Sequence, residues 1–290
     1  MRTLVAIDLS PASDEALRQG TPSEALAVCH VIPNLHSVRP LFPHLALAES
    51  QLIDDLPRRA AEAISARVET VTGLAPSAYE TFIDTGVDYA EIARRAEAWK
   101  ADRIVVGAHG VSGLASILGG VAERVVRCAS CPVLVARPGK SDGPVIAATD
   151  LSDPSVPAIA AAVEESRRRG APLVVVHAMD FGDATMIGAA LAPFGVGPVI
   201  PASAIDETRA LAQQVIEGHL EALGAKGEVV IGNGPASSVI VRLAEQRGAG
   251  LLVVGTRGRT GIAHLALGSV AERVIRAASC SVLAVRLAGS

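Results

Sequence analysis

The sequence predicts an α/β protein with two tandem, open, doubly wound domains, each built around a five-stranded parallel sheet. Three observations support this fold class. The chain of 290 residues repeats itself, short Val- and Ile-rich runs alternate with helix-length segments, and 50% of the residues are hydrophobic although only 2% are aromatic. A core of branched aliphatic residues in short runs is typical of parallel strands that are buried on both faces.

An internal repeat divides the chain into two halves. Residues 103–137 match residues 251–286, and both segments contain the sequence VAERV. A chain of this length also favours two domains over one. We therefore expect one domain over residues 1–138 and a second over residues 144–290, joined by an exposed linker with Pro, Gly and charged residues.

Each copy alternates strands with helices, as expected for βαβ units with right-handed crossovers. The first copy has fewer residues between Asp8 and His30 than the second has between Asp150 and His177, so we expect its first helix to be shorter. In the second copy, apolar runs predict strands and amphipathic segments predict helices. Taken in order, we expect a strand at about 144–149, a helix at 154–169, a strand at 172–178, a helix at 204–223, a strand at 227–232, a helix at 236–247, a strand at 250–255, a helix at 268–278 and a strand at 281–286.

The last strand of each copy is predicted to pair with its counterpart. Pro132–Ala136 and Ser281–Val285 are apolar and would otherwise form exposed hydrophobic edges, which proteins normally cover. Such pairing would make one chain an intramolecular pseudo-dimer, and a homo-oligomer is the alternative arrangement.

Two apolar segments follow the second strand of each copy. Ala184–Ile205 carries no charged residue, but its prolines and glycines would break a lipid-exposed helix, so we interpret it and its counterpart Leu35–Leu52 as loops. Long loops in compact domains are commonly functional. We expect a lid over the ligand or a docking surface for a second chain. We also expect a cytoplasmic protein with no membrane partner, because the chain starts directly with a predicted strand.

Charge and cysteine content exclude further classes. With 26 Lys and Arg against 30 Asp and Glu and seven aromatic residues, the chain lacks the basic, ring-rich surface of a nucleic-acid-binding protein. Cys128 and Cys131 have CxxC spacing, but no second such pair exists. We interpret both as small buried apolar residues and predict no metal site.

A glycine-containing loop in the second copy is the strongest functional signal. Gly255 and Gly258 follow a Val-rich strand, and Gly268 and Ser269 open the next helix. Glycines allow the backbone to approach a ligand closely, and a helix start offers N–H groups and a positive dipole end to an anion. The Ser269 hydroxyl would either donate to a phosphate or cap the helix, and Arg257 adds positive charge. Ordinary turns would explain each feature singly; together they favour a phosphate-binding loop.

This loop matches the pattern G-x₂-G-x₉-G-[ST], and the chain resembles the universal stress protein family over nearly its whole length. The resemblance implies an adenine nucleotide as the partner, and ATP, with or without Mg²⁺, as the ligand. It places Thr149, Asp150 and Ala178 near the adenine and the glycines after the third strand near the ribose. The residues from Val254 to Gly258 follow the ribose and phosphates, and Gly268, Ser269 and Val270 hold the phosphates. The residues so implied in the second copy are Thr149, Asp150, Ala178, Gly232, Gly234, Val254, Gly255, Gly258, Gly268, Ser269 and Val270.

The first copy departs from this pattern. When the copies are aligned on VAERV, Gly120 stands in place of Ser269 and the loop is one residue shorter. Shifting the pattern by one residue restores the spacing at Gly120, but Val121 then follows, so the hydroxyl is missing in both alignments. We therefore expect the second copy to bind ATP more tightly. The candidate residues of the weaker site are Asp8, Val31, Gly107, Gly110, Gly119 and Gly120.

Four polar residues at strand ends could each serve either the structure or a site. His30 and His177 match one another, and we interpret them as structural rather than catalytic. Asp8 and Asp150 belong to different copies, so we expect each to hydrogen-bond a base or to cap the following turn.

Enzyme signatures are missing from the sequence. It contains no G-x₄-G-K-[ST], no G-x-S-x-G and no H-E-x-x-H motif, and no Lys lies in the glycine loop. We predict no catalytic residue. We expect an ATP-binding stress or regulatory protein that signals through nucleotide-dependent conformation or association with a protein partner that the sequence does not identify. A nucleotide-free scaffold for protein contacts and a slow ATPase are the alternatives.

Overall fold

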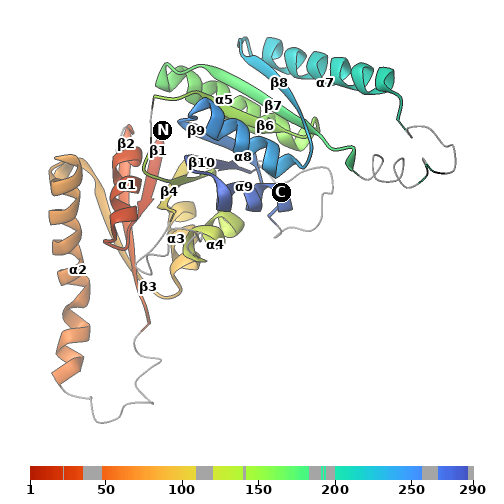
Figure 1. Cartoon of the computed structure of the whole chain (residues 1–290). Helices are drawn as coiled ribbons and strands as arrows, with labels where there is room; N and C mark the ends of the chain where they lie inside the picture. The colour runs from red at the N-terminus through yellow and green to blue at the C-terminus, as the bar shows by residue number, and fades with distance from the viewer. Residues whose placement is uncertain are drawn as a thin grey trace. The chain divides into compact units, whose positions relative to one another are not determined.

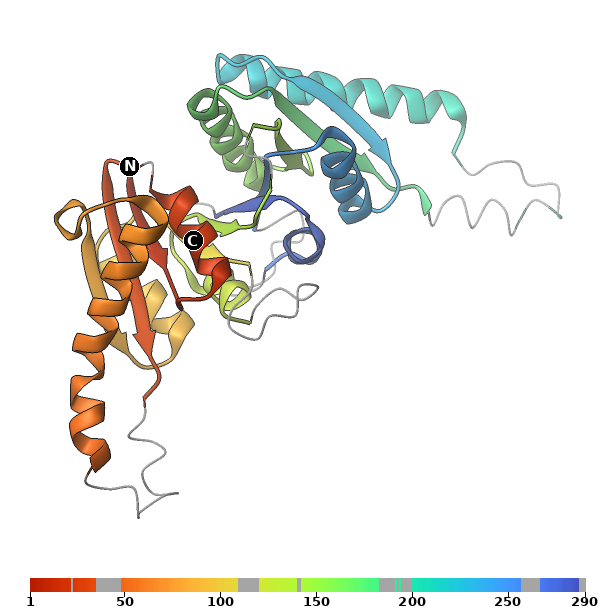
Figure 2. The same cartoon turned by 60° about the vertical axis from the view of Figure 1, so that its left-hand side comes forward.

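The computed structural model describes residues 1–21, 23–34, 48–108, 120–139, 142–182, 191, 193, 200–256 and 267–286. It contains two compact units, Met1–Pro138 and Gly139–Ser290. Figures 1 and 2 show the elements of both units from two directions.

The first unit has a parallel sheet with the strand order β3-β2-β1-β4-β5. The chain starts in the middle at β1, moves outward through β2 to β3, and then returns to the other side of β1. The strand order therefore reverses between β1 and β4, which is where open α/β sheets bind their ligands. The strands are β1 (Arg2–Ala6), β2 (Ala25–Ile32), β3 (Glu80–Thr85), β4 (Arg103–Gly107) and β5 (Val133–Ala136).

Helices cover both faces of this sheet. The first helix packs on β1, β4 and β5 and contacts the long second helix, whereas the third helix packs on β2 and β3 and contacts the fourth. These two pairs lie on opposite faces of the sheet (Figure 2). The helices are α1 (Pro11–Gly20), α2 (Ala48–Thr72), the short 3₁₀ turn η4 (Pro76–Ala78), α3 (Asp88–Ala98) and α4 (Gly120–Cys128).

The second unit repeats this topology, with the strand order β8-β7-β6-β9-β10 and parallel pairing between these neighbours. Its first two helices contact one another, and its last two contact one another, as in the first unit. The strands are β6 (Val145–Thr149), β7 (Leu173–Met179), β8 (Glu228–Asn233), β9 (Leu251–Gly255) and β10 (Ser281–Val285). The helices are η5 (Asp153–Ser155), α5 (Val156–Arg169), α7 (Ala202–Ala222), α8 (Ala236–Arg247) and α9 (Ser269–Ala277).

The central strands form the core of each unit. Leu4, Ile104, Ile146 and Leu252 are fully buried, and they lie on β1, β4, β6 and β9. Runs such as LLVVG are apolar without alternation because helices cover both faces of the strand.

Local residues begin and end the helices. Before α1, the Ser10 side chain accepts a hydrogen bond from the Ser13 N–H, and Pro11 occupies the first helical position. Gly170 and Gly248 end α5 and α8 in the left-handed conformation, with φ of 62° and 59°. Only glycine adopts this conformation without strain, so both helices stop there.

The strands expected in the second copy are confirmed to within one residue at each end, and the helices to within two. The first helix of the first copy is also shorter, as expected, with 10 residues in α1 against 14 in α5. The two predicted apolar loops lie mostly outside the described residues. Their last residues are helical rather than loop, because α2 begins at Ala48 and α7 at Ala202.

Candidate functional site

Each unit has a cavity at the carboxyl ends of its central strands. The first unit's cavity lies beyond β1, β2 and β4, and the second unit's lies beyond β6, β7 and β9. In both units this is the point where the strand order reverses. Parallel strands bring residues far apart in the sequence together at such an edge.

The second unit's cavity has a volume of about 270 Å³. Several predicted site residues line it: Thr149, Asp150, Ala178, Val254, Gly255, Gly268, Ser269 and Val270. Gly232 and Gly234 do not line it; they lie on β8 and in the turn after it. Arg257 and Gly258 lie outside the described residues. The cavity is also lined by residues of helices and neighbouring strands that the sequence did not predict: Ala148, Ser155, His177, Ala236, Ile240 and Ala271.

The start of α9 borders this cavity. Gly268 is the N-cap residue and has no side chain with which to cap the helix, and its N–H donates to the Thr256 carbonyl at 2.9 Å. Gly268 has a φ of −60°, so a left-handed backbone is not the reason for a glycine here. Ser269 is the first helical residue, and its hydroxyl therefore does not cap α9. The helix start can thus offer backbone N–H groups and a hydroxyl to an anion.

The turn after β6 presents Asp150 to the cavity. Its Oδ1 accepts from the Ser152 N–H at 3.1 Å and from the Ser152 hydroxyl at 2.5 Å. Between them Leu151 has a φ of 65°, which is uncommon for a residue with a side chain. The Thr149 hydroxyl lies 2.7 Å from that of Ser155 and accepts from the Leu151 N–H at 3.0 Å, so it stabilises the turn.

The two matched histidines have the structural role expected of them. Nδ1 of His30 lies 2.8 Å from the carbonyl oxygen of Ile7, and Nδ1 of His177 lies 2.9 Å from that of Thr149. Because a carbonyl only accepts, each Nδ1 carries the proton. Each histidine therefore ties the second strand of its unit to the residue just before the aspartate. Both histidines also line the cavities of their units.

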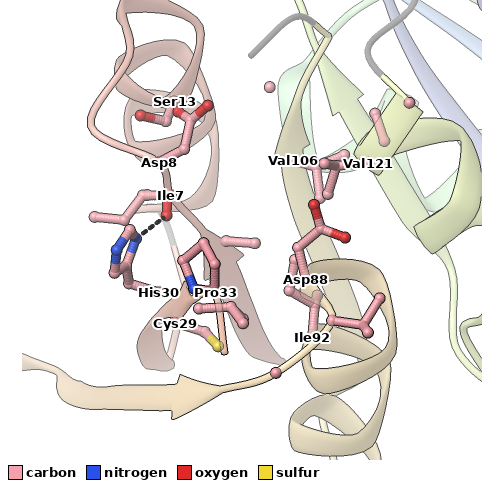
Figure 3. Close-up of a pocket in the computed structure, with 17 residues that line it drawn as sticks. Ile7, Asp8, Ser13, Cys29, His30, Pro33, Asp88, Ile92, Val106 and Val121 are labelled. Carbon is pink, nitrogen blue, oxygen red and sulfur yellow. Dashed lines mark hydrogen bonds between the residues drawn. The ribbon is translucent and has the colours of Figure 1, made fainter. Parts of the chain in front are cut away.

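The first unit's cavity is larger, with a volume of about 480 Å³. Asp8, Val31, Gly107 and Gly120 of the predicted residues line it, whereas Gly110 and Gly119 lie outside the described residues. Figure 3 shows side chains from several separate elements around this cavity. Further lining residues, which the sequence did not predict, include Ser13, Cys29, Pro33, Asp88 and Ile92.

Asp88 distinguishes the two cavities. It is the first residue of α3 and the third residue after β3, and Ala236 holds the same position between β8 and α8. Figure 3 shows its carboxylate on the cavity side of α3, below Val106 and Val121. Oδ1 of Asp88 accepts from the Tyr89 N–H at 2.7 Å. Sequence spacing alone could not assign this residue to the site, since it lies 80 positions from Asp8.

The glycines of the first unit serve packing as well as the cavity. A Cβ on Gly107 would lie 2.6 Å from the Ala12 carbonyl oxygen, so the backbone of α1 requires a glycine there. A Cβ on Gly120 would meet nothing within 4 Å, so the space in which Ser269 has its hydroxyl is open at this position.

A buried carboxylate, Asp84, pairs with two partly exposed arginines near the first cavity. Asp84 on β3 is 8% exposed, and its Oδ2 accepts from Nε of Arg95 at 2.8 Å while its Oδ1 accepts from Arg94 at 3.0 Å. Hydrogen bonding to Arg95 holds the pKa of Asp84 below its usual value. Burial, and then the nearby Asp84 charge, raises the pKa of Cys29 to about 12. The thiol facing this cavity is therefore protonated at neutral pH.

The prediction for the CxxC pair is partly wrong. Cys128 is exposed at the end of α4, because the last turn of this helix turns that side chain to solvent. Cys131 is half-buried, and burial raises its pKa to about 11. Within the described ranges, no three His, Cys, Asp or Glu side chains gather closely enough to hold a metal ion. None of the helices described is both long and apolar enough to span a membrane.

Comparison with known proteins gives the family. The universal stress protein family matches residues 1–137 and again 143–286. A universal stress protein from Mycolicibacterium smegmatis is 29% identical over 298 aligned positions, covering 98% of this chain and 96% of that protein. One from Mycobacterium tuberculosis is 31% identical over 64% of this chain, and the match spans 62% of that protein's length.

A solved structure supports the fold. The crystal structure of a universal stress protein from Archaeoglobus fulgidus matches with a TM-score of 0.69 and 22% identity, covering 98% of both chains. Both halves of the chain thus match the same family, and their shared topology agrees with the solved fold. The chain belongs to the universal stress protein family and carries two of its domains in tandem.

Proposed function

We propose that this protein binds ATP in the cavity of its second unit and acts as a regulatory binding protein rather than an enzyme. The observation that carries the proposal is the junction of β9 and α9. Gly255 at the strand end, and Gly268 and Ser269 at the helix start, line one cavity, at the strand ends where ligands bind in open α/β sheets.

The chemistry of this cavity suits the parts of a nucleotide. The backbone N–H groups at the start of α9 and the Ser269 hydroxyl offer donors to phosphate oxygens. Val254 and Ile240 supply apolar walls for a base. Asp150 supplies a carboxylate that can accept from an exocyclic amine. Arg257 follows β9 in the sequence and lies outside the described residues.

The position of Asp150 favours a binding role over a catalytic one. Asp150 already accepts two hydrogen bonds from Ser152 that hold its turn. Its carboxylate is therefore engaged in positioning the turn. We propose that ATP acts by stabilising one conformation or association state of the chain.

Calorimetric titration of ATP into the nucleotide-free full chain tests the proposal. Ser269→Ala should weaken ATP binding about 10- to 100-fold, because a hydrogen bond to a charged group contributes about 1.5–3 kcal/mol. Ser238→Ala is the matched control, since Ser238 is exposed on α8 and does not line the cavity. Absence of ATP binding to the parent chain would support the nucleotide-free scaffold instead.

A further inference from the structure

The two cavities have the same position in their units but differ in the number of carboxylates that line them and in the residue at the helix start. The second cavity has one carboxylate, Asp150, and the Ser269 hydroxyl. The first has two carboxylates, Asp8 and Asp88, and Gly120 at the position of Ser269. No Lys or Arg is among the described residues that line either cavity, so the difference between the two lies in the second carboxylate and the missing hydroxyl.

The connecting segments extend this contrast in the sequence. Residues 109–119, which join β4 to α4, contain no Lys or Arg. Residues 257–266, which join β9 to α9, contain Arg257 and Arg259. These segments lie outside the described residues; among the described lining residues, the first copy has one more carboxylate than the second and lacks the hydroxyl of Ser269.

Asp88 lies where a phosphate would be least tolerated. It starts α3, and α3 packs against α4, whose first residues Gly120 and Val121 line the same cavity. The next residue, Tyr89, has its ring 5.3 Å from the guanidinium carbon of Arg124 on α4. A carboxylate at this place faces the helix start and repels a second anion there.

The same groups suit a ligand that donates hydrogen bonds and carries no phosphate. Asp8 and Asp88 accept hydrogen bonds from hydroxyl or amino groups. Val31, Ile92 and other aliphatic side chains give apolar walls. A volume of about 480 Å³ lies in the range of pockets that enclose small organic ligands.

We propose that the first unit's cavity binds a purine nucleoside without phosphates and excludes ATP. This rests on the proposed function, since it takes the two cavities as variants of one nucleotide site. Asp8 and Asp88 accept from the amino and hydroxyl groups of the nucleoside, and the Asp88 charge rejects the triphosphate.

Titrating adenosine into the full chain in the presence of saturating ATP tests the proposal. We expect one adenosine per chain to bind, because ATP then occupies only the second unit. Asp88→Ala, which introduces the residue found at position 236, should weaken adenosine binding about tenfold or more and allow a second ATP to bind. Asp88→Asn keeps the side chain's size and should also admit ATP, which covers the case in which the alanine variant does not fold.

The reciprocal variant is the matched control. Ala236→Asp should weaken ATP binding at the second unit about tenfold or more and leave adenosine binding to the first unit unchanged. Two equivalent ATP molecules per parent chain, or no adenosine bound when ATP occupies one site, would overturn the inference while the proposed function stands. A third outcome separates the two proposals: the parent chain binds one adenosine and no ATP, and Asp88→Ala abolishes adenosine binding. The proposed function would then fail, whereas the specificity of the first cavity would stand.

Discussion

Nδ1 of His177 donates a hydrogen bond of 2.9 Å to the carbonyl oxygen of Thr149, and His30 makes the same bond of 2.8 Å to Ile7 in the other unit. In each case the acceptor is the residue just before the aspartate of the cavity. The bond joins the ends of two adjacent parallel strands where their regular pairing stops. It thereby holds the turn from which the aspartate projects.

Replacing this histidine tests its positioning role. His177→Ala should lower the free energy of unfolding of the second unit by about 1 kcal/mol, the net value of one hydrogen bond. His177→Asn should retain most of the stability, because the Asn amide nitrogen is separated from Cα by as many bonds as Nδ1. Urea unfolding curves of both variants measure this difference, and equal losses in the two would show that the bond to Thr149 contributes nothing.

Gly107 and Gly120 should respond oppositely to alanine. Gly107→Ala places a methyl group against the Ala12 carbonyl oxygen at 2.6 Å, and a backbone atom on a packed helix cannot move away easily. We expect a loss of about 1–3 kcal/mol in the free energy of unfolding, the usual cost of overpacking. Gly120→Ala enters open space at a helix start and should leave stability unchanged or raise it. Thermal unfolding compares them, and similar transition temperatures would contradict the close approach.

Asp84 should make the first unit sensitive to acid. Its folded-state pKa is lowered by hydrogen bonds from Arg95, so its contribution to stability is complete above the pKa of the unfolded chain. The contribution is lost as the pH falls through the lowered folded-state value. Asp84→Asn should lower the free energy of unfolding of the first unit by about 1.5–3 kcal/mol at neutral pH. It should also reduce the fall of that free energy as the pH is lowered, which urea unfolding curves at several pH values measure.

Asp55 provides the control for this prediction. It pairs with Arg58 and Arg59 on the solvent side of α2, and Arg58 is 61% exposed. Exposed pairs contribute little, so Asp55→Asn should leave the unfolding curve at neutral pH unchanged. Equal effects of the two substitutions would show that burial of Asp84 does not matter.

The four cysteines should react with a disulfide reagent in a definite order. Cys128 is exposed and should react first at pH 8. Cys29 and Cys131 should react slowly, because burial raises their pKa values to about 12 and about 11 and suppresses the thiolate. Buried Cys280 should also be protected. In Cys128→Ala the fast phase should vanish, and a fast phase that persists would contradict the assignment; unfolding in urea should make all remaining thiols reactive.

The sequence by itself predicted the fold class, the repeat and the strand positions of the second copy. These depend on short-range patterns: apolar runs such as LLVVG read as buried strands wherever they occur, and repetition of VAERV aligns the two copies. It also identified Gly255, Gly268 and Ser269 as neighbours, because one strand–loop–helix junction holds all three.

Only the tertiary structure decided which distant residues share a cavity. Asp88 joins Asp8 because right-handed crossovers bring the ends of β1 and β3 to the same sheet edge, and no local pattern records that crossover. The roles of Thr149 and Ser155 in one turn, and the exposure of Cys128, likewise depend on how helices pack on the sheet. Periodicity tells which face of an element is apolar, whereas packing determines which side chain stands opposite it.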